Sequence, residues 1–157
     1  MSNEKKELLV KFNQWTKFVE NLKDERDEIW NKPIAVGKWT IREVVSHIML
    51  WDQIFYERAI DKIANQVPLT LKHTNFDEFN EQAKQYGRTT SVKTLSENSI
   101  FYRKKIIEQI ETLSDENYNK VYTDKEGKAF HVTQYLKDFL WHDKHHMDQM
   151  KECLGLK

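Results

Sequence analysis

Apolar residues recur at intervals of three and four positions along most of this chain, the spacing of amphipathic helices. The first such series predicts a helix over about residues 3–22 and comprises Leu8, Phe12, Trp15, Val19 and Leu22. The same spacing predicts further helices over about 40–65, 76–86, 91–113 and 132–154. Only four glycines and two prolines interrupt the chain, which favours long helices over many short strands.

Residues that favour helix ends mark several of these boundaries. Thr40 is followed three positions later by Glu43, the capping-box pattern in which each side chain binds an otherwise unpaired backbone N–H. We expect the short helix after residue 75 to end at Gly87 and the last helix to be capped by Gly155.

Two stretches between the helices are distinctive. Residues 66–74 contain Pro68 and are expected to form a long crossover, and residues 121–130 place β-type residues on both sides of a Lys-Glu-Gly turn, as in a small hairpin. The sequence therefore predicts an all-α four-helix bundle with one long crossover and a small hairpin before the last helix. The length of 157 residues predicts a single domain over residues 1–157.

The charge balance bears on the partners of the protein. Twenty-five basic and 25 acidic residues cancel, whereas a nucleic-acid binder would show a basic excess, so we expect no nucleic-acid partner. The short charged runs at 23–28 and 103–105 are interpreted as solvated helix surface.

Compartment is indicated by apolar runs and by cysteine content. No apolar run approaches the length of a membrane span, and the first residues lack the apolar segment of a signal peptide. Cys153 is the single cysteine and cannot form an internal disulfide, which suits a reducing compartment. We expect a cytoplasmic protein without a membrane partner, with Cys153 as a small buried apolar residue rather than a reactive thiol.

Three of the six histidines lie within WHDKHHMDQM, residues 141–150. A helix turns by about 100° per residue, which places His142 and His146 together on one shoulder of the apolar face and directs His145 to solvent. Two imidazoles one turn apart can bind one metal ion, although such pairs are more often surface pairs or interior pairs satisfied by hydrogen bonds.

A third ligand would strengthen the interpretation, and His47 is the candidate. It lies on a similar shoulder of its own helix, about 80° from the centre of the apolar stripe. The alternative is a partly buried histidine whose ring is satisfied by hydrogen bonds. His73 and His131 lie in or beside expected loops and match no ligand spacing, so we interpret them as surface residues.

Asp143 is unusual because it falls on the apolar side of the last helix. It either pairs with a base in a network or dimer interface, or it forms a partly exposed salt bridge, which is the simpler interpretation.

Two segments, WTIREVVSHIMLWD (39–52) and HDKHHMDQ (142–149), resemble the DinB-like, or DinB/YfiT, family of helical-bundle metalloproteins. That family pairs a Trp-Ser/Thr helix start with a histidine about two turns later and closes with His-x-x-x-His, often followed by Gln. Here the pattern corresponds to Trp39-Thr40, His47, His142, His146 and Gln149, and the resemblance covers nearly the whole chain.

The resemblance implies a divalent metal at one end of the bundle, zinc, nickel or manganese, held by His47, His142 and His146. It also implies a homodimer. Some members of the family are transferases or isomerases that use a low-molecular-weight thiol as co-substrate, and others are known only as stress-inducible proteins.

Two hypotheses about function follow. Three neutral imidazoles leave a divalent metal with open positions. The first hypothesis is therefore a metal-dependent enzyme, a bacillithiol-type S-transferase or a hydrolase, that activates a thiol or water for attack on a small-molecule electrophile. Glu43 could orient His47, although the capping box competes for it, and Gln149 and Tyr135 are weaker candidates for contacts with the ligands. The second hypothesis is a non-catalytic, stress-related binding module with a structural or vestigial metal site.

Overall fold

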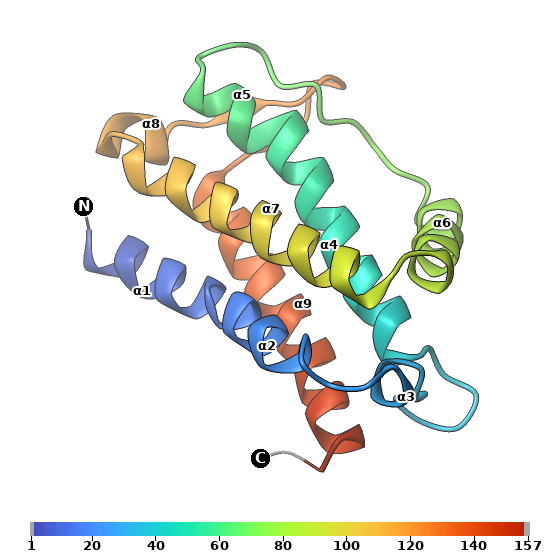
Figure 1. Ribbon diagram of the computed structural model, residues 1–157. Coiled ribbons are helices and arrows are strands. Elements are labelled where there is room, and N and C mark those ends of the chain that lie inside the picture. The colour runs from blue at the N-terminus through green and yellow to red at the C-terminus, as the bar shows by residue number, and fades with distance from the viewer. Residues whose placement is uncertain (1, 156–157) are drawn as a thin grey trace.

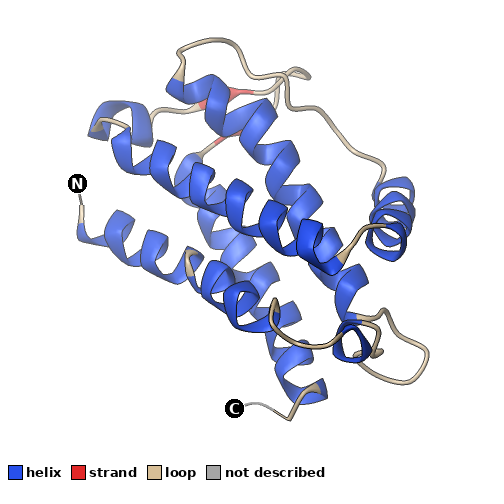
Figure 2. Cartoon of the chain, viewed as in Figure 1, coloured by secondary structure: helices blue, strands red, loops and turns tan. Residues whose placement is uncertain are grey.

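The computed structural model of the protein describes residues 2–155. Helices account for most of these residues, and the two short strands are the exception (Figure 2). In chain order the elements are α1 (Asn3–Phe12), α2 (Gln14–Leu22), α3 (Asp27–Trp30), α4 (Ile41–Phe55), the π-helical turn η1 (Tyr56–Ile60), α5 (Asp61–Ala64), α6 (Phe76–Thr89), α7 (Val92–Thr112), α8 (Asp115–Asn119), β1 (Tyr122–Thr123), β2 (Ala129–Phe130) and α9 (Val132–Cys153).

Four long rods form the bundle (Figure 1). They are α1 with α2, then α4 continued by η1 and α5, then α7, and finally α9. The second and third rods run in the same direction, so the chain must return along the bundle between them. The crossover of residues 65–75 and the transverse helix α6 make that return, and the predicted all-α four-helix bundle with a long crossover is confirmed.

The ends of the elements follow the expected capping chemistry. Thr40 and Glu43 form the complete capping box of α4. Gly155 has φ +71, as a glycine just after a helix requires. The predicted hairpin is present, with β1 and β2 antiparallel and Gly127 at φ +82 in the turn between them.

The first and second rods depart from the prediction of unbroken helices. The first is interrupted at Asn13, which lies between α1 and α2. The second widens into the π-helical turn η1 before α5 continues it. Neither irregularity leaves a periodicity signal, because the apolar residues keep nearly the same face on both sides.

Gly87 corrects a second expectation about the helices. It does not end α6, which continues to Thr89. Instead α6 passes so close to the first turns of α4 that a Cβ at position 87 would lie 2.9 Å from the Arg42 carbonyl oxygen and 3.0 Å from Ser46 Cβ. Close helix packing, and not helix termination, accounts for this glycine.

A buried ion-pair cluster lies between two apolar layers of the core. Arg103 of α7 donates from Nε and Nη2 to the two oxygens of Asp52 on α4, at 2.8 and 3.0 Å. Its Nη1 donates to Asp143 of α9 at 2.8 Å and to the Phe12 carbonyl at the end of α1 at 3.0 Å. One guanidinium therefore joins all four rods of the bundle.

This cluster overturns the surface assignment of Arg103 and decides between the two alternatives for Asp143. Arg103 was expected among the solvated residues 103–105, but its side chain is fully buried. Of the two alternatives for Asp143, the pair with a base in a network is confirmed and the partly exposed salt bridge is wrong, because Asp143 is 1 % exposed and pairs with Arg103. Periodicity alone assigns charged residues to the surface, and it misses a charge whose partners come from distant parts of the sequence.

None of the described helices combines the length and apolar character needed to cross a lipid bilayer.

Candidate metal centre

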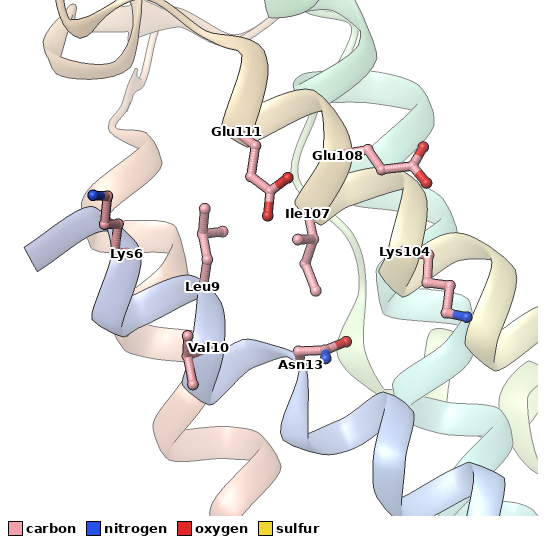
Figure 3. Close-up of a pocket in the computed structure, with 8 residues that line it drawn as sticks. All are labelled: Lys6, Leu9, Val10, Asn13, Lys104, Ile107, Glu108 and Glu111. Carbon is pink, nitrogen blue, oxygen red and sulfur yellow. The ribbon is translucent and has the colours of Figure 1, made fainter. Parts of the chain in front are cut away.

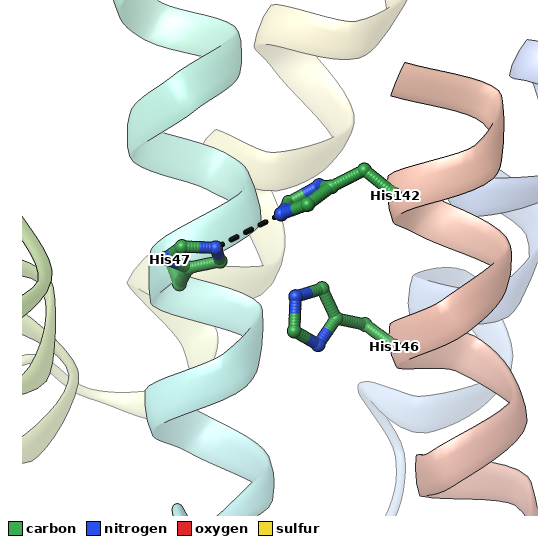
Figure 4. A group of neighbouring side chains, drawn as sticks. All are labelled: His47, His142 and His146. Atoms are coloured by element: carbon green, nitrogen blue, oxygen red, sulfur yellow. Dashed lines mark hydrogen bonds between the residues drawn. The ribbon is translucent and has the colours of Figure 1, made fainter. Parts of the chain in front are cut away.

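Three imidazole rings from two helices converge at one point between α4 and α9 (Figure 4). They belong to His47, His142 and His146, and one nitrogen of each lies within 4.8 Å of the corresponding nitrogens of the other two. The Nε2 atoms of His47 and His142 are 3.1 Å apart. The structure thus brings together the three histidines that the sequence singled out, across a separation of 95 residues.

The helical geometry explains this convergence. His142 and His146 are one turn apart on α9, and their ring centroids are 4.6 Å apart. The complete capping box fixes the start of α4 less than two turns before His47. His47 is almost fully buried, with Trp39 and Phe79 in edge contact with its ring.

Burial favours the neutral form of two of these imidazoles. Desolvation, with smaller contributions from His142 and His146, lowers the pKa of His47 from 6.5 to about 3. Desolvation and the neighbouring histidines likewise lower the pKa of His146 to about 4. A neutral imidazole has a free nitrogen lone pair, which is the form that binds a metal.

The outward nitrogens of the three rings share a second feature. Each Nδ1 is buried and has no hydrogen-bond partner among the described residues. An oxygen-bearing side chain interacts with each ring: Asn80 of α6 with His47, Asp143 with His142, and Gln149 with His146.

Two of these acceptor oxygens are themselves unpaired within the described chain. They are Asn80 Oδ1 and Asp143 Oδ1, and the latter lies 3.9 Å from Nδ1 of His142. Small rotations would pair these donors and acceptors, as in metal sites where each ligating histidine donates its other N–H to an oxygen. Asn80 was not among the expected residues. It lies on α6, whose position beside α4 is set by the crossover and leaves no pattern in the local sequence.

The other candidate residues lie elsewhere. Both oxygens of Glu43 are engaged away from His47, Oε1 with Thr40 and Oε2 with Arg88 Nε at 3.0 Å. The capping box has prevailed, so Glu43 does not orient the His47 ring. Tyr135 is buried among phenylalanines and lies near the Arg103 cluster, which places it outside the contacts of the histidines.

The remaining histidines and Cys153 have surface or peripheral positions. His145 is exposed and stacks on Trp141, and His73 and His131 are also exposed. Cys153 is half-buried, and its Sγ lies 3.2 Å from the Pro33 carbonyl oxygen, to which it can donate a weak hydrogen bond.

The donor set and its surroundings suit a divalent ion. Ligand nitrogens about 2.0–2.1 Å from a tetrahedral zinc lie about 3.3 Å from one another, close to the observed separation of His47 and His142. The Nε2 atoms of these two rings face each other, and each of the three rings with an unpaired Nδ1 has an oxygen-bearing side chain beside it. Three protein ligands without a fourth are typical of catalytic sites, which keep a position open.

Another hollow, of about 420 Å³, lies between α1 and α7 (Figure 3). Its wall contains two lysines, two glutamates, one asparagine and three apolar residues, and none of the histidines. It therefore plays no part in the candidate centre.

Fold and site together define a helical bundle with a three-histidine cluster. The sequence model of the DinB superfamily matches residues 11–150, so the chain belongs to the DinB superfamily. The family that the sequence motifs indicated is thereby confirmed.

Two solved structures show the same fold. YfiT from Bacillus subtilis, described as a probable metal-dependent hydrolase with an unusual four-helix bundle topology, is 16% identical; the match has a TM-score of 0.77 and covers 100% of this chain and 91% of that one. A mycothiol-dependent maleylpyruvate isomerase is 12% identical; its TM-score is 0.71, and the match covers 96% of this chain but only 63% of the isomerase. A comparison with curated protein sequences gives no significant match.

Proposed function

We propose that the protein is a metal-dependent enzyme in which His47, His142 and His146 hold one divalent ion. The observation that carries the proposal is the convergence of one nitrogen from each of three imidazoles within 4.8 Å. The fold likeness to YfiT, described as a probable metal-dependent hydrolase, and to a mycothiol-dependent isomerase supports it. The ion is zinc, nickel or manganese, and imidazole suits zinc and nickel better than manganese.

The chain's own residues would position the reactants. A divalent ion at this point supplies Lewis acidity, which lowers the pKa of water or of a thiol toward neutrality. The low pKa values of His47 and His146 keep the ligands unprotonated at neutral pH. Asn80, Asp143 and Gln149 would accept the Nδ1 protons and thereby hold the rings with Nε2 inward.

The reaction that we propose is attack by a thiol or by water on a small-molecule electrophile. Low-molecular-weight thiol transfer, of the bacillithiol type, is the first alternative, and hydrolysis is the second. The protein is proposed to work in the cytoplasm as a homodimer with a small-molecule substrate.

Turnover assays on chelator-treated and metal-reloaded protein test this proposal. One assay contains glutathione or cysteine with chlorodinitrobenzene or monochlorobimane, and the other contains p-nitrophenyl acetate without thiol. We expect turnover in one assay that disappears with chelator and with His142→Ala but survives His145→Ala. Stoichiometric metal without turnover in either assay would favour a binding module with a structural metal.

A further inference from the structure

A hollow of about 560 Å³ opens directly onto the histidine cluster. Its wall includes His47 and His142 at the inner end. Three helices contribute five aromatic side chains to the wall, Trp51 and Phe55 from α4, Phe76 from α6, and Phe139 and Trp141 from α9. Small-molecule sites in proteins have this size and this apolar, aromatic lining with a few polar groups.

The aromatic rings form a continuous surface that leads to the imidazoles. The ring of Trp51 lies 5.9 Å from that of Phe76 and 6.2 Å from that of Phe139, measured between centroids. Phe139 in turn lies 5.5 Å from the ring of His142. A flat apolar molecule placed on this surface therefore has one end at the candidate metal centre.

The two rings at the mouth are unusually exposed. Phe76 is 61% exposed and Trp141 is 72% exposed, whereas Trp51 deeper in the hollow is 8% exposed. Large aromatic side chains left in water beside a concavity indicate a surface that binds another molecule. Phe76 contacts the rings of Trp51 and His73, and Trp141 stacks on the exposed His145.

The outer wall comes from the two segments that lie outside the bundle. The crossover contributes residues 71–74, and the hairpin contributes Asp124 and Lys128. The Lys125 N–H donates to the Leu71 carbonyl at 2.8 Å, and the His73 N–H donates to the Glu126 carboxylate, so the two segments hold each other in place. These two segments form the rim of the hollow, and the hydrogen bonds between them fix its shape.

The charges on the rim are balanced. Lys72 and Lys128 contribute two positive charges, and Asp124 and Asp138 contribute two negative ones. The two carboxylates accept hydrogen bonds from uncharged groups, Asp124 from the N–H groups of Glu126 and Lys128 and Asp138 from the Gln134 amide. The rim thus selects neither a strong anion nor a strong cation, and the aromatic wall favours an apolar body.

We propose that this hollow binds an uncharged, planar apolar molecule, with its body on Trp51 and Phe139 and its polar group toward His47 and His142. Binding requires only the aromatic wall. The inference rests on the proposed function in one respect, namely that the bound molecule is the electrophilic substrate.

The test uses N-phenyl-1-naphthylamine, an uncharged aromatic dye whose fluorescence rises in apolar surroundings. It is titrated into the full chain, both chelator-treated and reloaded with Zn²⁺. We expect saturable binding to one site per chain in both forms. Its anionic relative 1-anilinonaphthalene-8-sulfonate should bind no more tightly than the neutral dye.

Variants at the mouth locate the site without disturbing the core. Phe76→Ala and Trp141→Ala remove exposed rings, and each should weaken dye binding by about fivefold to tenfold. Thr74→Trp places a bulky ring in the hollow and should abolish binding. Phe101→Ala is the matched control, because Phe101 is 49% exposed on α7 and does not line the hollow.

The outcomes separate this inference from the proposed function. Dye binding that responds to the mouth variants in a protein without metal or turnover would support the inference and contradict the proposed function. Three results would overturn the inference and leave the metal site standing. They are stoichiometric metal binding without saturable dye binding, dye binding that Phe76→Ala and Trp141→Ala leave unchanged, and a clear preference for the sulfonate.

Discussion

Arg103 joins the interior of the bundle to the candidate metal centre. Its guanidinium stays protonated in proteins, and two buried carboxylates face it, so the cluster carries one net negative charge when both are ionised. Asp143 belongs to this cluster and is the immediate neighbour of His142 in α9. A divalent cation at the histidines would therefore lie beside compensating negative charge, although the three ligands themselves are neutral.

Replacement of Arg103 should be costly. Arg103→Met leaves Asp52 and Asp143 buried without their partner, and loss of one side of a buried ion pair costs about 3–5 kcal/mol. Lys104→Met is the matched control, because Lys104 is half exposed and its ion pair with Glu20, at 3.6 Å, contributes less than about 1 kcal/mol. Urea unfolding measures both variants, and equal unfolding midpoints would show that the cluster contributes little to stability.

The buried imidazoles predict how stability depends on pH in the metal-free protein. The pKa of His47 is about 3 in the folded chain, below the ordinary value of 6.5. As the pH falls below 6.5, His47 becomes protonated in the unfolded chain but stays neutral in the folded chain. The stability present above pH 6.5 is therefore lost as the pH falls, by on the order of 3 kcal/mol at pH 4 from His47 alone.

His47→Gln isolates this contribution. The difference in unfolding free energy between the wild type and the variant should change steadily from pH 7 to pH 4, to the disadvantage of the wild type. Asp52, whose pKa burial raises to about 6, acts in the opposite sense but equally in both proteins. Parallel pH profiles for the two proteins would contradict the assignment of a buried neutral imidazole.

At the scale of elements, the position of α6 depends on its contact with α4. Gly87 permits that contact, and Arg88 adds an ion pair with Glu43 at 3.0 Å. The same helix carries Asn80, which interacts with His47, and Phe76, which lies at the mouth of the hollow. The contact between α4 and α6 therefore fixes the positions of Asn80 beside His47 and of Phe76 at the mouth of the hollow.

Gly87→Ala tests this contact. At an exposed position inside a helix the change would stabilise the protein by about 1 kcal/mol, because alanine has a higher helix propensity than glycine. Here the new Cβ meets the backbone of α4, and overpacking of this kind costs about 1–3 kcal/mol. Thermal unfolding should thus show a loss of stability, with Gln82→Ala on the exposed face of α6 as a neutral control.

The sequence predicted those elements whose signals are local. The capping box of α4, the His-x-x-x-His pair and the hairpin turn were all visible in short segments. The path of α6 was not, because Gly87 reports a contact with residues more than forty positions away. Arg103 was misplaced for the same reason, since its partners Asp52 and Asp143 are remote in sequence.

At the scale of the whole molecule, the two parallel rods and the long crossover determine where the hollow beside the histidines forms. Because α4 and α7 run in the same direction, the chain must cross the bundle between them, and the crossover with the hairpin then forms the outer wall of the hollow. The single domain over residues 1–157 and the homodimer stay predictions. Coincident unfolding transitions and sedimentation of the full chain would check them.

The central claim is that His47, His142 and His146 hold one divalent ion. Calorimetric titration of chelator-treated protein with Zn²⁺ tests it most directly. We expect one ion per chain for the wild type and for His145→Ala, and loss of stoichiometric binding for His47→Ala. Stoichiometric binding that survives His47→Ala, or that disappears with His145→Ala, would contradict it.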